Sequence, residues 1–166
     1  MSNQNQPITI LIADDDLDDC VLLREAFQES VVDYRLLFVH DGTELLQFLS
    51  RQGKFTSPAS APTPDLVLLD LNMPGMDGRE ALAEIKANPN IRRIPVVVLT
   101  LSRDPQDIMH IYDLGGSGFI IKPETFEGML EVINVLSQYW FETVELASGQ
   151  SVKKASRSKT YQSFSG

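Results

Sequence analysis

Short blocks of apolar residues recur along the chain, and each block is followed by a polar loop. The blocks occupy residues 8–13, 34–39, 66–69, 95–100 and 119–123. They are too short for typical helices, and Pro64 and Pro74 bound the third block. Continuous apolar runs of this length are typical of strands that are covered on both faces of a parallel sheet.

Between these blocks, apolar residues return at the spacing of one helix face. The predicted helices span residues 17–30, 41–51, 79–87, 104–114 and 126–140. Asp104 is expected to cap the fourth helix, with Pro105 at its first position. Regular alternation of strand and helix predicts an α/β fold with right-handed crossovers. We expect a flavodoxin-like, doubly wound, five-stranded parallel sheet in the order 2-1-3-4-5.

Length and composition are those of one globular domain, with 166 residues of which 43% are hydrophobic. We expect a disordered N-terminus at 1–7, a domain at 8–147 and a basic, Ser-rich tail at 148–166. The chain shows neither a membrane span nor an export signal, and its single cysteine, Cys20, forms no internal disulfide. These features predict a cytoplasmic protein.

The net charge of -9 argues against a nucleic-acid surface across the domain, because phosphate contacts need clustered Lys and Arg. The tail carries four basic side chains and no acid, which is little for binding either nucleic acid or a membrane. Residues 141–166 are too few and too polar to form a second core, so no DNA-binding domain is expected.

Polar side chains stand at the carboxyl ends of four predicted strands. They are Asp14 and Asp15 after the first strand, Asp70 after the third, Thr100 at the end of the fourth and Lys122 at the end of the fifth. In a parallel sheet these ends meet at one edge, where ligands of open α/β folds bind. Asp18 and Asp19 have a local explanation, since acids in the first turn of a helix are favoured by its dipole.

Crowded carboxylates repel one another unless one keeps a proton or a hard cation neutralises them. Oxygen ligands without nearby His or Cys point to Mg²⁺, whose usual partner is a phosphoryl group. Asp70 is then the best nucleophile, because a carboxylate can attack phosphorus to form an acyl phosphate. Taken singly, Thr100 could be an ordinary strand residue and Lys122 a solvated lysine; their coincidence at the strand ends favours a shared function.

These residues resemble the receiver domain of two-component response regulators over about residues 8–138. The resemblance rests on motifs in the correct order and spacing: Asp14-Asp15, Asp70 with Leu71-Asn72-Met73-Pro74, Asp77-Gly78, Thr100 and Lys122-Pro123. It implies that Asp70 is the phosphoacceptor and that Asp15, Asp70 and the Asn72 carbonyl bind Mg²⁺, with Asp14 acting through water. It further implies that Thr100 and Phe119 form a switch, that Lys122 binds the phosphoryl group, and that the Lys122-Pro123 bond is cis. The alternative for Phe119 is that it is simply a core residue.

The long loop before the third strand and the aromatic segment at 138–146 are similar to response regulators that pair with cyanobacterial phytochromes. That narrower resemblance implies a histidine-kinase photoreceptor as phosphodonor. It also implies a stand-alone homodimer formed through the fourth helix, fifth strand, fifth helix and aromatic extension. Tyr139, Trp140 and Phe141 cannot all face one core, so at least one is expected at a partner surface. The alternative is that they fold back as a cap on their own domain.

Leu101 departs from the receiver pattern, in which a small residue usually follows the switch threonine. We expect its side chain to narrow access to the acyl phosphate and to slow its hydrolysis.

Two other functions fit parts of the pattern. A haloacid-dehalogenase-like phosphatase also uses a strand-end Asp, Mg²⁺ and a lysine, but it needs a second acid two residues after the nucleophile. That position holds Asn72, which does not shuttle protons and disfavours turnover. A degenerate docking module is the other alternative, and the complete set of acids, Thr100 and Lys122 argues against it.

Overall fold

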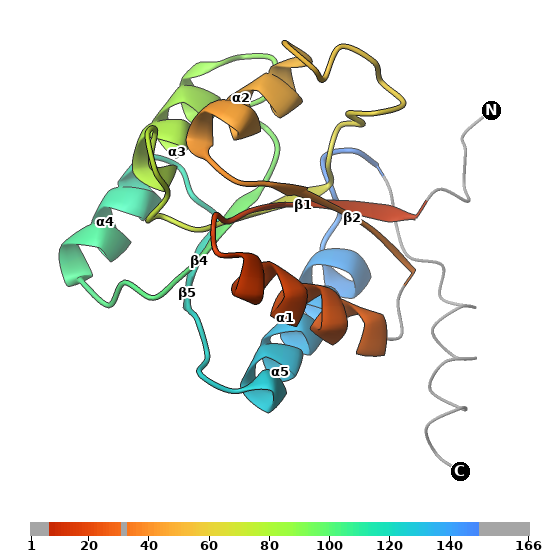
Figure 1. Ribbon diagram of the computed structural model, residues 1–166, viewed down its shortest axis with the longest axis vertical. Helices are drawn as coiled ribbons and strands as arrows, with labels where there is room; N and C mark the ends of the chain where they lie inside the picture. Colours follow the sequence, from red (N-terminus) through yellow and green to blue (C-terminus); the bar gives the residue numbers. More distant parts are fainter. Residues whose placement is uncertain (1–6, 31–32, 150–166) are drawn as a thin grey trace.

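The computed structural model describes residues 7–30 and 33–149 and shows five strands and five α-helices in strict alternation (Figure 1). The strands are β1 (Ile8–Ala13), β2 (Tyr34–Val39), β3 (Leu66–Leu69), β4 (Val96–Thr100) and β5 (Gly118–Ile121). The helices are α1 (Leu17–Glu29), α2 (Gly42–Ser50), α3 (Gly78–Ala87), α4 (Pro105–Asp113) and α5 (Phe126–Ser137). The predicted N-terminal segment and the basic tail lie almost wholly outside the described residues.

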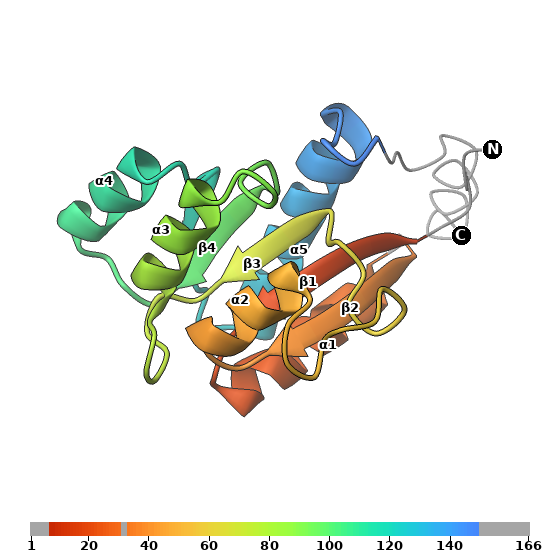
Figure 2. The same cartoon turned by 90° about the horizontal axis from the view of Figure 1, so that it is seen from above.

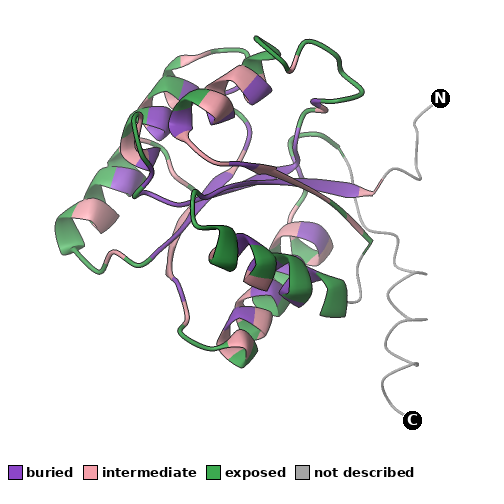
Figure 3. Ribbon diagram, viewed as in Figure 1, coloured by how far each residue is buried: buried purple, intermediate pink, exposed green. Residues whose placement is uncertain are grey.

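The strands form one parallel sheet in the order β2-β1-β3-β4-β5, which confirms the predicted fold. Helices α1 and α5 cover one face of the sheet, and α2, α3 and α4 cover the other (Figure 2). Successive side chains of β1 point to opposite faces of the sheet. Ile10 and Ile12 pack against α1 and α5, whereas Leu11 packs against α2 and α3. The three central strands, β1, β3 and β4, are buried, and they lie between two layers of more exposed helices (Figure 3).

The register of the sheet brings the predicted strand ends together. Ala13 on β1 pairs with Leu69 on β3, so the acids that follow each strand become neighbours. Thr100 on β4 pairs with Ile121 on β5, so Lys122 follows directly beside the threonine. Four strand ends therefore converge at the carboxyl edge.

Side-chain caps begin every α-helix in the described chain. The capping residues are Asp16, Asp41, Asp77, Asp104 and Thr125, each of which accepts hydrogen bonds from backbone N–H groups of the first turn. Because the helices run antiparallel to the strands, these caps lie in the loops of the carboxyl edge. The capped helices hold the loops that carry the site.

The last helix differs from its prediction. α5 ends at Ser137 instead of continuing to residue 140, and a π-helical turn, η1 (Gln138–Thr143), follows it. The wider turn changes the direction in which successive side chains point. Phe141 is 3% exposed and packs edge-on against Tyr34, whereas Tyr139 is 53% exposed. The aromatic extension is thus partly a cap on its own domain.

Within the described residues, no helix is both long enough and apolar enough to cross a lipid bilayer.

Candidate functional site

Asp70 stands at the centre of the carboxyl edge, immediately after β3. Its backbone N–H donates to the carbonyl oxygen of Ala13 at 2.9 Å, which extends the β1–β3 pairing to this residue. Asp70 is buried, with 7% of its surface exposed. A Cβ atom at Gly78 would collide with the Asp70 carbonyl oxygen, so the start of α3 packs directly against this loop only because residue 78 is glycine. Asp70 is therefore rigidly placed.

Two hydrogen-bond donors flank the Asp70 carboxylate. The Thr100 hydroxyl donates to Asp70 Oδ1 at 2.8 Å, and Lys122 Nζ lies 3.4 Å from Asp70 Oδ2. Both donor residues are buried, at 0% and 5% exposure. A hydroxyl and an ammonium are thus aimed at the same carboxylate from β4 and from the end of β5.

Asp14 and Asp15 complete the acidic part of the site. One carboxylate oxygen from each of Asp14, Asp15 and Asp70 can be chosen so that all three lie within 4.8 Å of one another. Asp14 and Asp70 are buried, and Asp15 is exposed at the rim. An all-oxygen set with one open side fits a hard divalent cation that keeps several waters. Asn72 lies exposed in the loop after β3, and its predicted role as a carbonyl ligand stays a prediction.

The pKa values of two groups in this cluster, Asp14 and Lys122, are both raised, for different physical reasons. Loss of solvent raises the pKa of Asp14 from 3.8 to about 6, against the lowering effects of Lys122 and of the Asp16 backbone N–H. Burial alone would lower the pKa of Lys122, but hydrogen bonds to Asp14 and Asp19 raise it above its ordinary value. The ammonium therefore stays charged, and the Asp14 carboxyl keeps its proton to a higher pH than an ordinary aspartate does.

Asp19 belongs to this cluster, although its position in the first turn of α1 had a sufficient local explanation. Its Oδ2 atom lies 2.6 Å from Lys122 Nζ, closer than Asp14 Oδ2 at 2.8 Å. The sequence does not indicate this contact, because Asp19 and Lys122 are 103 residues apart and only the fold brings them together. The expectation that the helix dipole accounts for Asp19 was incomplete.

The predicted switch residues lie on adjacent strands. Phe119 on β5 is half-buried and packs against the core on the α2–α4 face, and it pairs with Val98 two residues before Thr100. The Lys122–Pro123 bond is trans, so the expected cis bond is wrong. The cis and trans forms of an X–Pro bond differ by only about 0.5–1 kcal/mol in free energy, so the Lys-Pro sequence alone does not predict which isomer is present.

Only part of the predicted aromatic interface is exposed in the structure. Phe141 is buried and Trp140 is half-buried against the α1–α5 core, so Phe141 is a core residue and not a contact surface. Tyr139 remains open. Other large apolar side chains exposed on α4 and α5 are Met109, Tyr112 and Val135.

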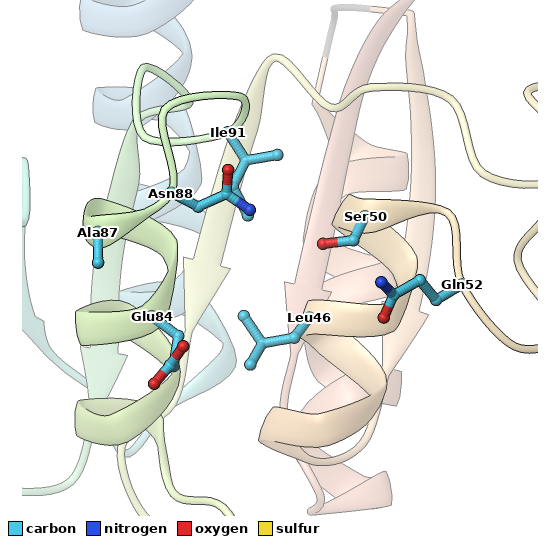
Figure 4. Close-up of a pocket in the computed structure, with 7 residues that line it drawn as sticks. All are labelled: Leu46, Ser50, Gln52, Glu84, Ala87, Asn88 and Ile91. Atoms are coloured by element: carbon cyan, nitrogen blue, oxygen red, sulfur yellow. The ribbon is translucent and has the colours of Figure 1, made fainter.

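A shallow cavity of about 290 Å³ lies between α2 and α3, away from the acidic cluster. Its walls include Leu46 from α2, Glu84 from α3 and Ile91 from the loop after α3 (Figure 4). These residues belong to the later turns of the helices and the loop beyond, toward the opposite edge of the sheet. None of the predicted site residues lines this cavity.

Comparison with known proteins matches residues 10–134 to the family described as response regulator receiver domain. The chain is 39% identical over 142 residues to the response regulator Rcp1 of Synechocystis sp., covering 86% of this chain and 95% of Rcp1. The crystal structure of the phosphorylated cyanobacterial phytochrome response regulator RcpA is similar, with a TM-score of 0.79 at 38% identity, covering 86% of this chain and 99% of RcpA. The Mn²⁺-bound form of Rcp1 gives a TM-score of 0.76 at 38% identity, covering 84% of this chain and 99% of Rcp1.

Proposed function

The chain belongs to the response regulator receiver domain family, and from this premise we propose that Asp70 accepts a phosphoryl group from a phytochrome-type histidine kinase. One observation carries the assignment of Asp70. Its buried carboxylate is the only acid of the described cluster that contacts both the Thr100 hydroxyl, at 2.8 Å, and the Lys122 ammonium, at 3.4 Å. Those two groups are suited to bind the oxygens of a phosphoryl group held at Asp70.

In the proposed transfer, an Asp70 carboxylate oxygen attacks the phosphorus of a phosphohistidine. A new O–P bond forms, the N–P bond breaks, and the histidine nitrogen keeps the electron pair and later takes a proton. Lys122 and Thr100 meet the negative charge on the phosphoryl oxygens with groups that the fold has already placed. The product is an acyl phosphate on Asp70.

The three clustered carboxylates fit Mg²⁺, because they offer only oxygen ligands in a partly open site. Asp15, Asp70 and the Asn72 carbonyl would hold the ion, and Asp14 would act on it through water. When bound, Mg²⁺ supplies charge neutralisation for the carboxylates and for the incoming phosphoryl group. The Mn²⁺-bound form of Rcp1 supports a divalent cation in a related protein.

The consequence of phosphorylation is proposed to be a change of surface. The phosphoryl group competes with Asp70 for the Thr100 hydroxyl, Thr100 moves toward it, and Phe119 enters the space released. The face formed by α4, β5 and α5 then changes its affinity for a partner. Storage of the phosphoryl group, not turnover, is favoured by Asn72, which supplies no general base two residues after Asp70.

The partners are proposed from the relatives. The similarity to the phytochrome response regulator RcpA supports a phytochrome-type sensor kinase as the donor, acting on the cytoplasmic side where ATP is available. Exposed apolar side chains on α4 and α5, together with Tyr139, support a homodimer through the α4–β5–α5 face.

Phosphotransfer from a purified phytochrome kinase to wild-type protein and to Asp70→Asn tests the central assignment. We expect label on the wild type that depends on Mg²⁺ and no label on Asp70→Asn. Asp33→Asn is the matched control, because Asp33 is exposed in the loop before β2. Equal labelling of Asp70→Asn and wild type would refute the assignment. Steady hydrolysis of small phosphate esters would instead favour the phosphatase.

A further inference from the structure

The side chain nearest to the Lys122 ammonium belongs to none of the receiver motifs. Asp19 Oδ2 lies 2.6 Å from Lys122 Nζ, compared with 2.8 Å for Asp14 Oδ2 and 3.4 Å for Asp70 Oδ2. Lys122 is 5% exposed at its side chain, while the Asp19 side chain is 27% exposed. The lysine is therefore enclosed among three acids, of which Asp19 is the one at the rim next to exposed Asp15 and Asp18.

An ammonium has three N–H donors, and a carboxylate stands opposite each of them. A phosphoryl oxygen at Asp70 can replace the long 3.4 Å contact to Asp70, but Lys122 moves closer to it only by loosening its short contact to Asp14 or to Asp19. Asp14 is buried, so losing its cationic partner is costly. Asp19 reaches solvent, so water can replace the lysine there. Of the contacts to the two acids that are not themselves phosphorylated, the one to Asp19 is the one that Lys122 can release at lower cost.

We propose that Asp19 is a positioning residue that holds Lys122 in the unphosphorylated protein and competes with the phosphoryl group for its ammonium. This proposal rests on the proposed function of Asp70 and Lys122. The strength of the Asp19 contact then sets how tightly the site holds a phosphoryl group. Attraction of acids to the positive end of the α1 dipole does not explain the contact, because that attraction applies equally to Asp18, which is exposed in the same turn.

Binding of beryllofluoride, an analogue of the phosphoryl group, tests the competition. Isothermal titration calorimetry with saturating Mg²⁺ would compare wild type, Asp19→Asn and Asp18→Asn. We expect Asp19→Asn to bind the analogue about three- to tenfold more tightly, the size of a partly exposed ion pair. Asp18→Asn removes the same charge from the same turn and should change the affinity by less than about twofold. Asp19→Glu, which keeps the carboxylate, should remain close to wild type.

Thermal unfolding without metal separates positioning from a merely structural role. Loss of the Lys122 contact should lower the Tm of Asp19→Asn by about 1–4 °C relative to Asp18→Asn. A purely structural residue would weaken both folding and binding, whereas the proposal requires lower stability with tighter binding. Equal affinities for Asp19→Asn and Asp18→Asn, or weaker binding by Asp19→Asn, would overturn it. If wild type and Asp70→Asn bound the analogue alike, the proposed function itself would fail.

Discussion

At the scale of single residues, the site carries more negative than positive charge, because one lysine serves three carboxylates. Burial raises the pKa of the Asp14 carboxyl from 3.8 to about 6, although Lys122 and the Asp16 backbone N–H act to lower it. Between these pH values the folded protein binds more protons than the unfolded chain. The contribution of Asp14 to stability is therefore fully present below about pH 4 and is lost as the pH rises through about 6.

We predict that Asp14→Asn makes the metal-free protein more stable at pH 7.5, by about 1–3 kcal/mol, and changes little at pH 4. The amide cannot ionise, so the loss of stability with rising pH should be much smaller. Urea unfolding in EDTA at several pH values measures this difference. Mg²⁺ should stabilise wild type more than the variant at pH 7.5. An unchanged pH dependence in Asp14→Asn would contradict the assignment of the raised pKa.

Leu101 is the other residue with a specific expectation. Its side chain follows Thr100 directly and is 65% exposed, so it belongs to the surface of the β4–α4 loop and not to the core. We predict that Leu101→Ala speeds the decay of the acyl phosphate roughly two- to fivefold, because water reaches the site more easily. The decay of labelled protein after removal of the donor measures this rate. A decay rate equal to wild type would show that Leu101 does not shield the phosphoryl group.

At the scale of elements, the π-helical turn η1 decides which aromatic residue belongs to the core. Phe141 is 3% exposed beside Tyr34, and the neighbouring Tyr139 is 53% exposed. We predict that Phe141→Ala lowers the free energy of unfolding by about 3–5 kcal/mol and that Tyr139→Ala lowers it by less than about 1 kcal/mol. Chemical denaturation of both variants gives the comparison. Similar losses from the two substitutions would contradict the position of η1.

At the scale of the whole molecule, exposed valines on two helices distinguish the proposed dimer face from another surface. α5 presents Val135 at 59% exposure on the proposed dimer face, and α1 presents Val21 at 50% on another helix. We predict that Val135→Asp weakens dimer formation at least about tenfold, because a charge would be buried in the interface. Val21→Asp is the matched control and should dimerise as wild type does. Sedimentation equilibrium measures both, and an unchanged dimer in Val135→Asp would place the interface elsewhere.

Much of the site was predictable because its main residues follow directly from local patterns. A buried strand that ends in Asp70, and another that ends in Thr100, can be recognised without tertiary information, and parallel topology then brings them together. The aromatic extension was less predictable. The spacing of apolar residues predicted that the last helix continues past Ser137. Only the structure shows that a π-helical turn begins there and that it directs Phe141 against Tyr34.

The sequence by itself determined the α/β alternation of strand and helix and the set of groups at the carboxyl edge of the sheet, because strand and helix periodicity are local and parallel strands share one polarity. Only the tertiary structure decided how Lys122 divides its ammonium among Asp14, Asp19 and Asp70. It also decided that Phe141, and not Tyr139, enters the core. Both outcomes depend on contacts between segments that are far apart in the chain, and local sequence propensity contains no information about such contacts.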